Sequence, residues 1–205
     1  METLECYLAY AAELHSGDGV STYDTWAGAH NAAEATGVEH NPLTVAGIAG
    51  YYNTYGKFAC YRSCLTIDTS ALPSNARISL AILKGTTLGG VDSVLHVVEG
   101  VHGDTAQASD FGSLLSKVES YGQVDWPGSP APFELTLNAA GLDRIVKGGQ
   151  TKFGLRLDND INNEEPTGPV EFIISRGSIE LYIEYTVSEP EIHPTHPTHP
   201  EHPSC

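Results

Sequence analysis

The hydrophobic pattern of residues 58–84 predicts two β-strands joined by a turn. Two apolar stretches flank the polar segment 68–76, whose serine, proline and asparagine residues favour a turn. Aliphatic side chains recur at alternate positions of the flanks, namely Leu65, Ile67, Ile78, Leu80 and Ile82. This spacing places them on one face of a sheet that packs against a core. We therefore expect strands at 58–67 and 77–83.

The same criteria predict an all-β fold for most of the chain. Further strands are expected at residues 5–14, 43–48, 93–99, 133–137, 151–157, 170–175 and 178–187. Short helices are expected at 110–118 and at 138–146, where Asn138 can cap the first turn and Gly148 can end the last. Residues 26–38 are interpreted as an irregular strand or loop. Together these elements predict a jelly-roll-like antiparallel β-sandwich with one or two short helices across residues 1–190.

The last segment, residues 191–205, differs from the rest because it repeats every three residues. Each repeat places a histidine before a proline, at His193, His196, His199 and His202, and the chain ends at Cys205. Proline disfavours helical geometry at the preceding residue, so polyproline II is expected. The histidines would then lie roughly 9 Å apart along one edge, too far to bind one metal ion together. We interpret the segment as an interaction tail that docks on a neighbouring copy or another protein; a pH-sensitive edge, or a metal bridge between chains, is an alternative.

The four cysteines do not predict a disulfide framework. Cys60 and Cys64 would lie roughly 13 Å apart along one strand, beyond the roughly 7 Å that a disulfide spans. Both are therefore interpreted as buried thiols that pack as small hydrophobic groups. Cys205 is the better candidate for a cross-link, either to another chain or to Cys6.

Composition excludes some partners. The 205 residues include 26 Asp and Glu against 10 Lys and Arg, giving a formal net charge of -16. This charge repels phosphate backbones, so nucleic-acid binding is disfavoured. No apolar run approaches the roughly 20 residues that span a bilayer, and the acidic residues 1–5 do not resemble a secretory leader. We expect a virion-surface or extracellular protein, either a mature fragment or a product released by lysis.

Two sets of side chains could bind ligands. The first alternates oxygen-bearing residues that would face one side of an extended segment, Asp158, Asp160, Asn162 and Glu164. Calcium prefers such ligands, although a solvated loop is the favoured explanation of the pattern. The second is aromatic: Trp26, Trp126, Tyr51, Tyr52 and Tyr55 could form a platform for sugar rings, or belong to the core or an interface. No G-x-S-x-G, phosphate-loop or H-E-x-x-H motif is present, so we expect a protein that is not an enzyme.

Several short strings resemble a known type of β-sandwich module. They are Tyr23 to Ala27, Tyr61 to Pro73, Ala76 to Ile78, Gly141 to Ile145, Thr151 to Arg156, Asp160 with Ile161, and Pro166 to Gly168. Their order resembles the DNRLRE-type, carbohydrate-binding-module-like domains of phage and prokaryotic surface proteins. The resemblance implies display, adhesion or assembly without catalysis. The expected function is a structural display protein of a virion, such as a decoration or fibre protein, or of an extracellular assembly, acting through contacts with itself or other subunits; the alternative is an adhesion module that binds host glycans.

Overall fold

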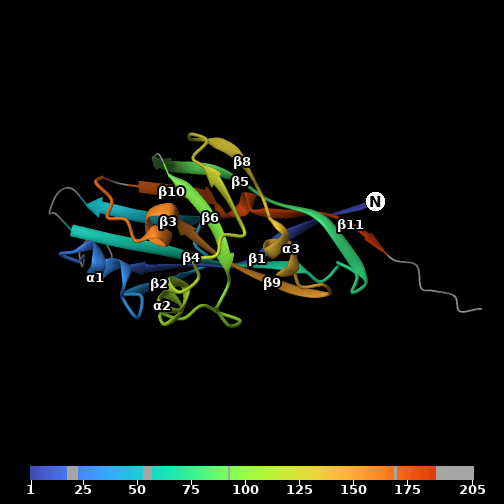
Figure 1. Cartoon of the computed structure of the whole chain (residues 1–205), viewed down its shortest axis with the longest axis horizontal. Helices are drawn as coiled ribbons and strands as arrows, with labels where there is room; N and C mark the ends of the chain where they lie inside the picture. Colours follow the sequence, from blue (N-terminus) through green and yellow to red (C-terminus); the bar gives the residue numbers. More distant parts are fainter. Residues whose placement is uncertain (18–22, 53–56, 92, 169, 188–205) are drawn as a thin grey trace, which may run out of the picture.

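The computed structural model describes residues 1–17, 23–52, 57–91, 93–168 and 170–187, with the backbone alone for residues 46–52. The strands in this part of the chain are β1 (Glu2–Ser16), β2 (Gly37–His40), β3 (Thr44–Tyr52), β4 (Lys57–Thr69), β5 (Ala76–Val91), β6 (Val94–Glu99), β7 (Gly122–Asp125), β8 (Ala131–Thr136), β9 (Gly149–Leu157), β10 (Val170–Ser175) and β11 (Glu180–Val187). The helices are α1 (Trp26–His30), α2 (Asp110–Leu115), α3 (Ala139–Asp143), α4 (Asp158–Asn162) and the short 3-10 helix η1 (Arg176–Ser178). The all-β class is confirmed, since all the strands named pair antiparallel (Figure 1).

The strands form a sandwich whose two layers are joined at their edges. One layer contains β11, β5, β10 and β8, and the other contains β4, β9, β6 and β7. Strand β1 belongs to both, because residues 2–7 pair with β11 and residues 8–16 pair with β4. At another edge, β3 pairs with β10 and β4. Strand β2 pairs with the end of β1.

The predicted strand, turn and strand around residues 58–84 are confirmed as β4 and β5, but these strands do not pair with each other. Strand β4 pairs with β1, β3 and β9, whereas β5 pairs with β8, β10 and β11. The connection turns through two backbone hydrogen bonds, from Leu72 N to Thr69 O and from Ala76 N to Pro73 O. It therefore carries the chain from one layer to the other.

The helices are short, and those identified by spacing and capping are present. Helix α2 lies within the predicted segment 110–118, and α3 lies within 138–146, where the Asn138 side chain accepts a hydrogen bond from Gly141 N. The interpretation of residues 26–38 as irregular strand or loop was wrong for residues 26–30, which form α1. Thr25 caps α1 by accepting a hydrogen bond from Gly28 N.

The two layers differ in what covers their outer faces. Strand β4 is buried on both faces, since Leu65 and Ile67 on one side and Arg62 and Cys64 on the other are fully inaccessible. Its second face is covered by α1, α2 and α4, and Figure 1 shows α1 and α2 on the same side of the strands, away from β8. No helix of the described part lies against the outer face of β11, where side chains such as Tyr182 remain partly exposed.

No helix in the described ranges is long and apolar enough to cross a membrane. The interaction tail, residues 191–205, lies outside the described residues, as does its predicted boundary with the sandwich at residue 190.

Candidate functional site

The proposed calcium ligands do not form an extended segment. Residues 158–162 form α4, followed by Asn163 in the left-handed conformation with φ of 53°. Asp160 points into the protein and is 1% exposed, whereas Glu164 is exposed. The interpretation of this segment as an extended chain with its oxygen ligands on one side is therefore wrong, because residues 158–162 form a helical turn. Among the described residues, no group of three or more His, Cys, Asp or Glu side chains is arranged to hold a metal ion.

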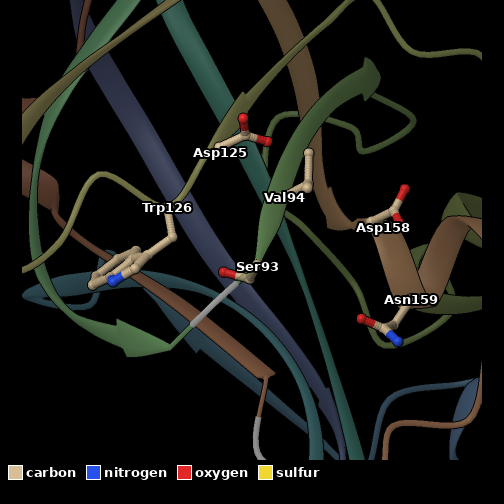
Figure 2. Close-up of a pocket in the computed structure, with 6 residues that line it drawn as sticks. All are labelled: Ser93, Val94, Asp125, Trp126, Asp158 and Asn159. Atoms are coloured by element: carbon tan, nitrogen blue, oxygen red, sulfur yellow. The ribbon is translucent and has the colours of Figure 1, made fainter.

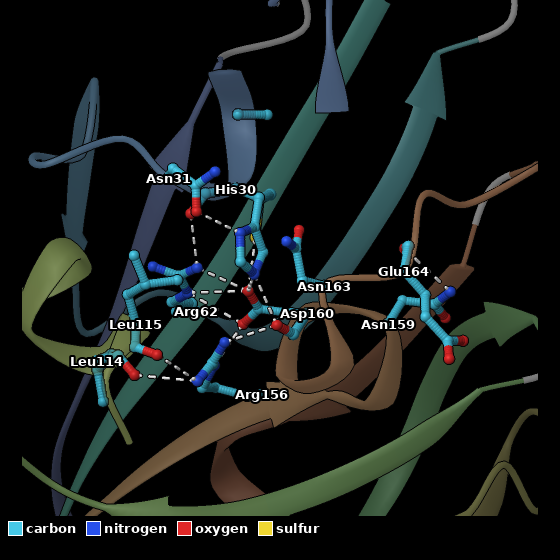
Figure 3. Close-up of polar contacts among 12 residues, drawn as sticks. His30, Asn31, Arg62, Leu114, Leu115, Arg156, Asn159, Asp160, Asn163 and Glu164 are labelled. Carbon is cyan, nitrogen blue, oxygen red and sulfur yellow. Dashed lines mark hydrogen bonds and ion pairs between the residues drawn. The ribbon is translucent and has the colours of Figure 1, made fainter. Parts of the chain in front are cut away.

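Asp160 instead binds two buried arginines (Figure 3). Arg62 Nη2 lies 2.6 Å from Asp160 Oδ1 and Arg62 Nε lies 3.0 Å from Oδ2. Arg156 Nε lies 2.5 Å from Oδ2, and its Nη2 donates to the Asp160 carbonyl at 2.7 Å. Burial alone would raise the pKa of Asp160, but the charges and hydrogen bonds of Arg62 and Arg156 outweigh it and hold this pKa well below its usual range.

Backbone carbonyls satisfy the remaining arginine donors. Arg62 donates to the carbonyls of Phe111 and His30, and Arg156 donates to those of Leu114, Leu115 and Lys117. These carbonyls lie on α2, at the end of α1 and just after α2. The cluster thus ties the outer layer of helices to β4 and β9. Every partner belongs to the protein itself, so we assign the cluster a structural role.

A pocket of about 270 Å³ opens beside this cluster, where β6, β7 and α4 meet. Its lining combines one indole ring with carboxylate, amide and hydroxyl groups: Ser93, Val94, Asp125, Trp126, Asp158 and Asn159. The sheet register explains why β6, β7 and α4 lie together. Val94 pairs with Asp125, and Leu95 pairs with Leu157, the residue before α4. Figure 2 shows Trp126 on one side of the β6 chain and Asn159 on the other.

Packing holds Trp126 in place. Its backbone N–H donates to Ser93 O at 2.8 Å, and its ring meets Phe172 edge-on, with centroids 5.1 Å apart. Gly90 allows this approach, since a Cβ there would lie 2.6 Å from the indole ring. The φ of Gly90 is +149°, which other residues rarely adopt. The wall of the pocket therefore depends on this glycine.

The two carboxylates of the pocket have different surroundings. Asp125 is exposed and makes no side-chain hydrogen bond or ion pair with another described residue. Asp158 Oδ1 accepts a hydrogen bond from Asn162 Nδ2 at 2.9 Å and lies 3.2 Å from His96 Nε2. Burial lowers the pKa of His96, and its contact with Asp158 offsets this only in part, so His96 is neutral at pH 7. Neither carboxylate consequently has a Lys or Arg partner among the described residues.

Of the proposed sugar-stacking residues, the structure places Trp126 at the pocket and Trp26 elsewhere. Trp26 is 3% exposed, packs against His30 and Phe58, and donates from Nε1 to Asn163 Oδ1. Its role as a stacking residue is thus excluded by burial. Tyr55 and the side chains of Tyr51 and Tyr52 lie outside the described residues.

Sequence reasoning missed Asp125, Ser93 and Asn159 as pocket residues and considered Asp158 for a different ligand. The adjacency of Asp125 and Trp126 before a proline-containing loop was the available signal. The pocket is formed by residues 93–94, 125–126 and 158–159. These segments lie far apart in sequence, so their proximity depends on the pairing of β6 with β7 and β9. A second pocket of about 220 Å³ lies near Glu99, Lys117 and Tyr121.

The interpretation of Cys60 and Cys64 as buried thiols is confirmed. Cys6, Cys60 and Cys64 are buried and unpaired with one another. Burial, with a smaller contribution from Asp68, raises the pKa of Cys6 to about 11, and burial also raises those of Cys60 and Cys64. These thiols are therefore unreactive at neutral pH. Cys205 lies outside the described residues.

No model of a known protein family matches the chain, and no curated protein is detectably similar to it in sequence. The resemblance to DNRLRE-type modules accordingly stays a prediction.

Proposed function

We propose that this chain is a non-enzymatic binding module that recognises carbohydrate in the pocket of Trp126, Asp125, Asp158 and Asn159. The observation that carries the proposal is the composition of this pocket. It joins one half-buried indole to the polar side chains of Ser93, Asp125, Asp158 and Asn159. Pockets with an apolar wall and a few placed polar groups are the usual form of small-ligand sites.

The chemistry of the lining suits a sugar. Sugar hydroxyl groups donate hydrogen bonds to carboxylates such as those of Asp125 and Asp158. The Asn159 amide can both donate and accept, and the indole of Trp126 offers apolar contact to the C–H groups of the ring. The volume of about 270 Å³ lies near the lower limit for ligand pockets, so we expect one sugar unit to enter, at the end of a glycan.

This function is tested by adding glycans to the protein and following its NMR signals to measure binding. Trp126→Ala and Asn159→Ala should each weaken sugar binding at least about tenfold, because each removes a contact group of the pocket. Gln123→Ala is the matched control, since Gln123 is exposed on β7 but does not line the pocket. Circular dichroism verifies that the variants fold. Binding that survives both pocket substitutions would refute the proposal.

Assembly into a virion or an extracellular structure is the second candidate. It is favoured by the uncovered outer face of β1 and β11, where Tyr7 is 62% exposed and Tyr182 and Glu184 are partly exposed. The tail, with His193, His196, His199, His202 and Cys205, would add contacts between subunits.

Sedimentation of the full chain and of a chain lacking residues 192–205 tests the assembly role. We expect the full chain to form oligomers, and the shortened chain to fold normally but to dissociate. Equal oligomeric states for the two chains would remove the tail from this role.

A further inference from the structure

Asp160 and Glu99 bind cationic side chains, whereas the two carboxylates of the pocket have no Lys or Arg partner in the described part of the chain. Asp160 binds two arginines, and Glu99 accepts from Lys117 Nζ at 2.8 Å and from Arg144 Nη1 at 2.9 Å. The described lining of the Trp126 pocket, in contrast, holds two carboxylates and no Lys or Arg side chain.

Asp158 and Asp125 therefore give the pocket a local negative charge. The Asp158 side chain is 42% exposed, and its neighbours are the Asn162 amide and the neutral His96. The guanidinium of Arg156 is nearby but is committed to Asp160 and three carbonyl groups. A ligand that brings a positive charge would complete this site.

The molecule contains an internal example of such an arrangement. Lys84 Nζ lies 4.7 Å from the centre of the Tyr182 ring and 3.6 Å from Glu134 Oε1. An ammonium group is thus held between an aromatic side chain and a carboxylate. The pocket provides the same pair of partners, with Trp126 as the aromatic group, and tryptophan is the most favourable ring for a cation.

From this charge and lining, we infer that the pocket selects an amino sugar, whose ammonium group binds Asp125 and Asp158 while Trp126 contacts the ring. The inference rests on the proposed sugar-binding function and names the class of sugar. A carboxylated sugar is disfavoured, because its charge would repel both aspartates. A neutral sugar would leave the two carboxylates without a cation.

Three β-1,4-linked trisaccharides that differ only at carbon 2 test the inference: cellotriose with hydroxyl groups, triacetylchitotriose with acetamido groups, and chitotriose with ammonium groups. We expect chitotriose to bind about 10- to 100-fold more tightly than the other two in 0.15 M salt, the range of a charge-assisted hydrogen bond. Asp125→Asn should remove most of this preference and keep the weaker binding of cellotriose.

General attraction to an acidic protein must be separated from recognition. Asp104→Asn is the control, since Asp104 is exposed, makes no side-chain hydrogen bond or ion pair with another described residue and does not line the pocket. If Asp104→Asn lowered the affinity for chitotriose as much as Asp125→Asn does, the attraction would be nonspecific and the inference would be overturned. Equal affinities for chitotriose and cellotriose would also overturn it but leave the sugar-binding function intact. If neither the trisaccharides nor any sugar of a wider panel shifts the NMR signals of the residues that line the pocket, the proposed sugar-binding function fails as well.

Discussion

Asp158 and Asp160 lie two residues apart on the same helix, yet they occupy two different environments. Asp160 faces the covered side of β4, where two arginines bind it and exposure falls to 1%. Asp158 faces the pocket, is 42% exposed and has no cationic partner at neutral pH. The first carboxylate is needed to keep buried arginines neutralised, whereas the second is available to a ligand. The face of one helical turn that carries a carboxylate thus decides whether it is buried with arginines or lines the pocket.

Removing the charge of Asp160 should have the largest effect. Asp160→Asn leaves Arg62 and Arg156 buried without an anion, so we expect a loss of about 3–5 kcal/mol in the free energy of unfolding. Urea denaturation measures it. Asp158→Asn is the matched control and should change stability by less than about 1 kcal/mol. Equal losses for the two variants would contradict the assigned difference.

Acid should weaken the covered side through His102. This residue is 4% exposed, contacts Thr66 Oγ1 through Nε2, and has no partner for Nδ1 within the described part of the chain. Burial first, and then Lys152, lowers the pKa of His102 from 6.5 to about 4. The unfolded chain therefore takes up a proton more readily than the folded one, so stability is complete above pH 6.5 and falls as the pH decreases toward 4.

The full decrease from His102 amounts to about 3 kcal/mol. Asp160 contributes almost no loss in this window, because the unfolded chain protonates this residue only as the pH falls to about 3.8, and the folded chain protonates it at still lower pH. Urea denaturation at several pH values between 7 and 4.5 measures how the free energy of unfolding changes with pH. This free energy should fall less steeply for His102→Gln than for the parent. An identical slope would show that His102 opens to water without consequence for stability.

The pocket side should be sensitive to Gly90. Gly90→Ala places a Cβ 2.5 Å from Glu171 O and 2.6 Å from the Trp126 ring, at a positive φ, so we expect a loss of about 1–3 kcal/mol and a shifted Trp126 fluorescence. Gly177→Ala is the control, because its Cβ would meet nothing within 4 Å. A spectrum unchanged by Gly90→Ala would contradict the packing described for Trp126.

Removal of divalent cations should have the smallest effect. Calcium at 100 times its Kd would stabilise the fold by about 2.7 kcal/mol if it bound residues 158–164. Because Asp160 is committed to arginines, we expect the Tm to be the same with and without chelator. A lower Tm in chelator would restore the metal hypothesis for this segment.

The elements were predictable where local rules apply. Alternating aliphatic residues identified β4, β5 and β11, since a strand with one face on a core must repeat every two residues. Asn138 identified α3 through its cap. Helix α1 was missed because five residues are too few for a helical hydrophobic period to emerge.

The candidate site was less predictable. Trp126 was recognised as a possible sugar contact, but Trp26 could not be distinguished from it, because burial depends on packing with distant residues such as Phe58. Asp158 and Asp160 were grouped together because an extended segment was assumed. The helical turn of α4 separates them to different surroundings.

The amino-acid sequence alone determined the sandwich class and most strand positions, because the period of hydrophobic residues is a local property. It also determined the acidic surface, since the charge follows from composition. Only the tertiary structure decided that β4 and β5 belong to different layers, that Arg62 and Arg156 share Asp160, and that Trp126 and Asp158 line one pocket. The physical reason is that folding brings together residues that are far apart in sequence, such as the paired Glu2 and Tyr185 or the ion pair of Arg62 and Asp160, and neither burial nor charge pairing exists until those contacts form.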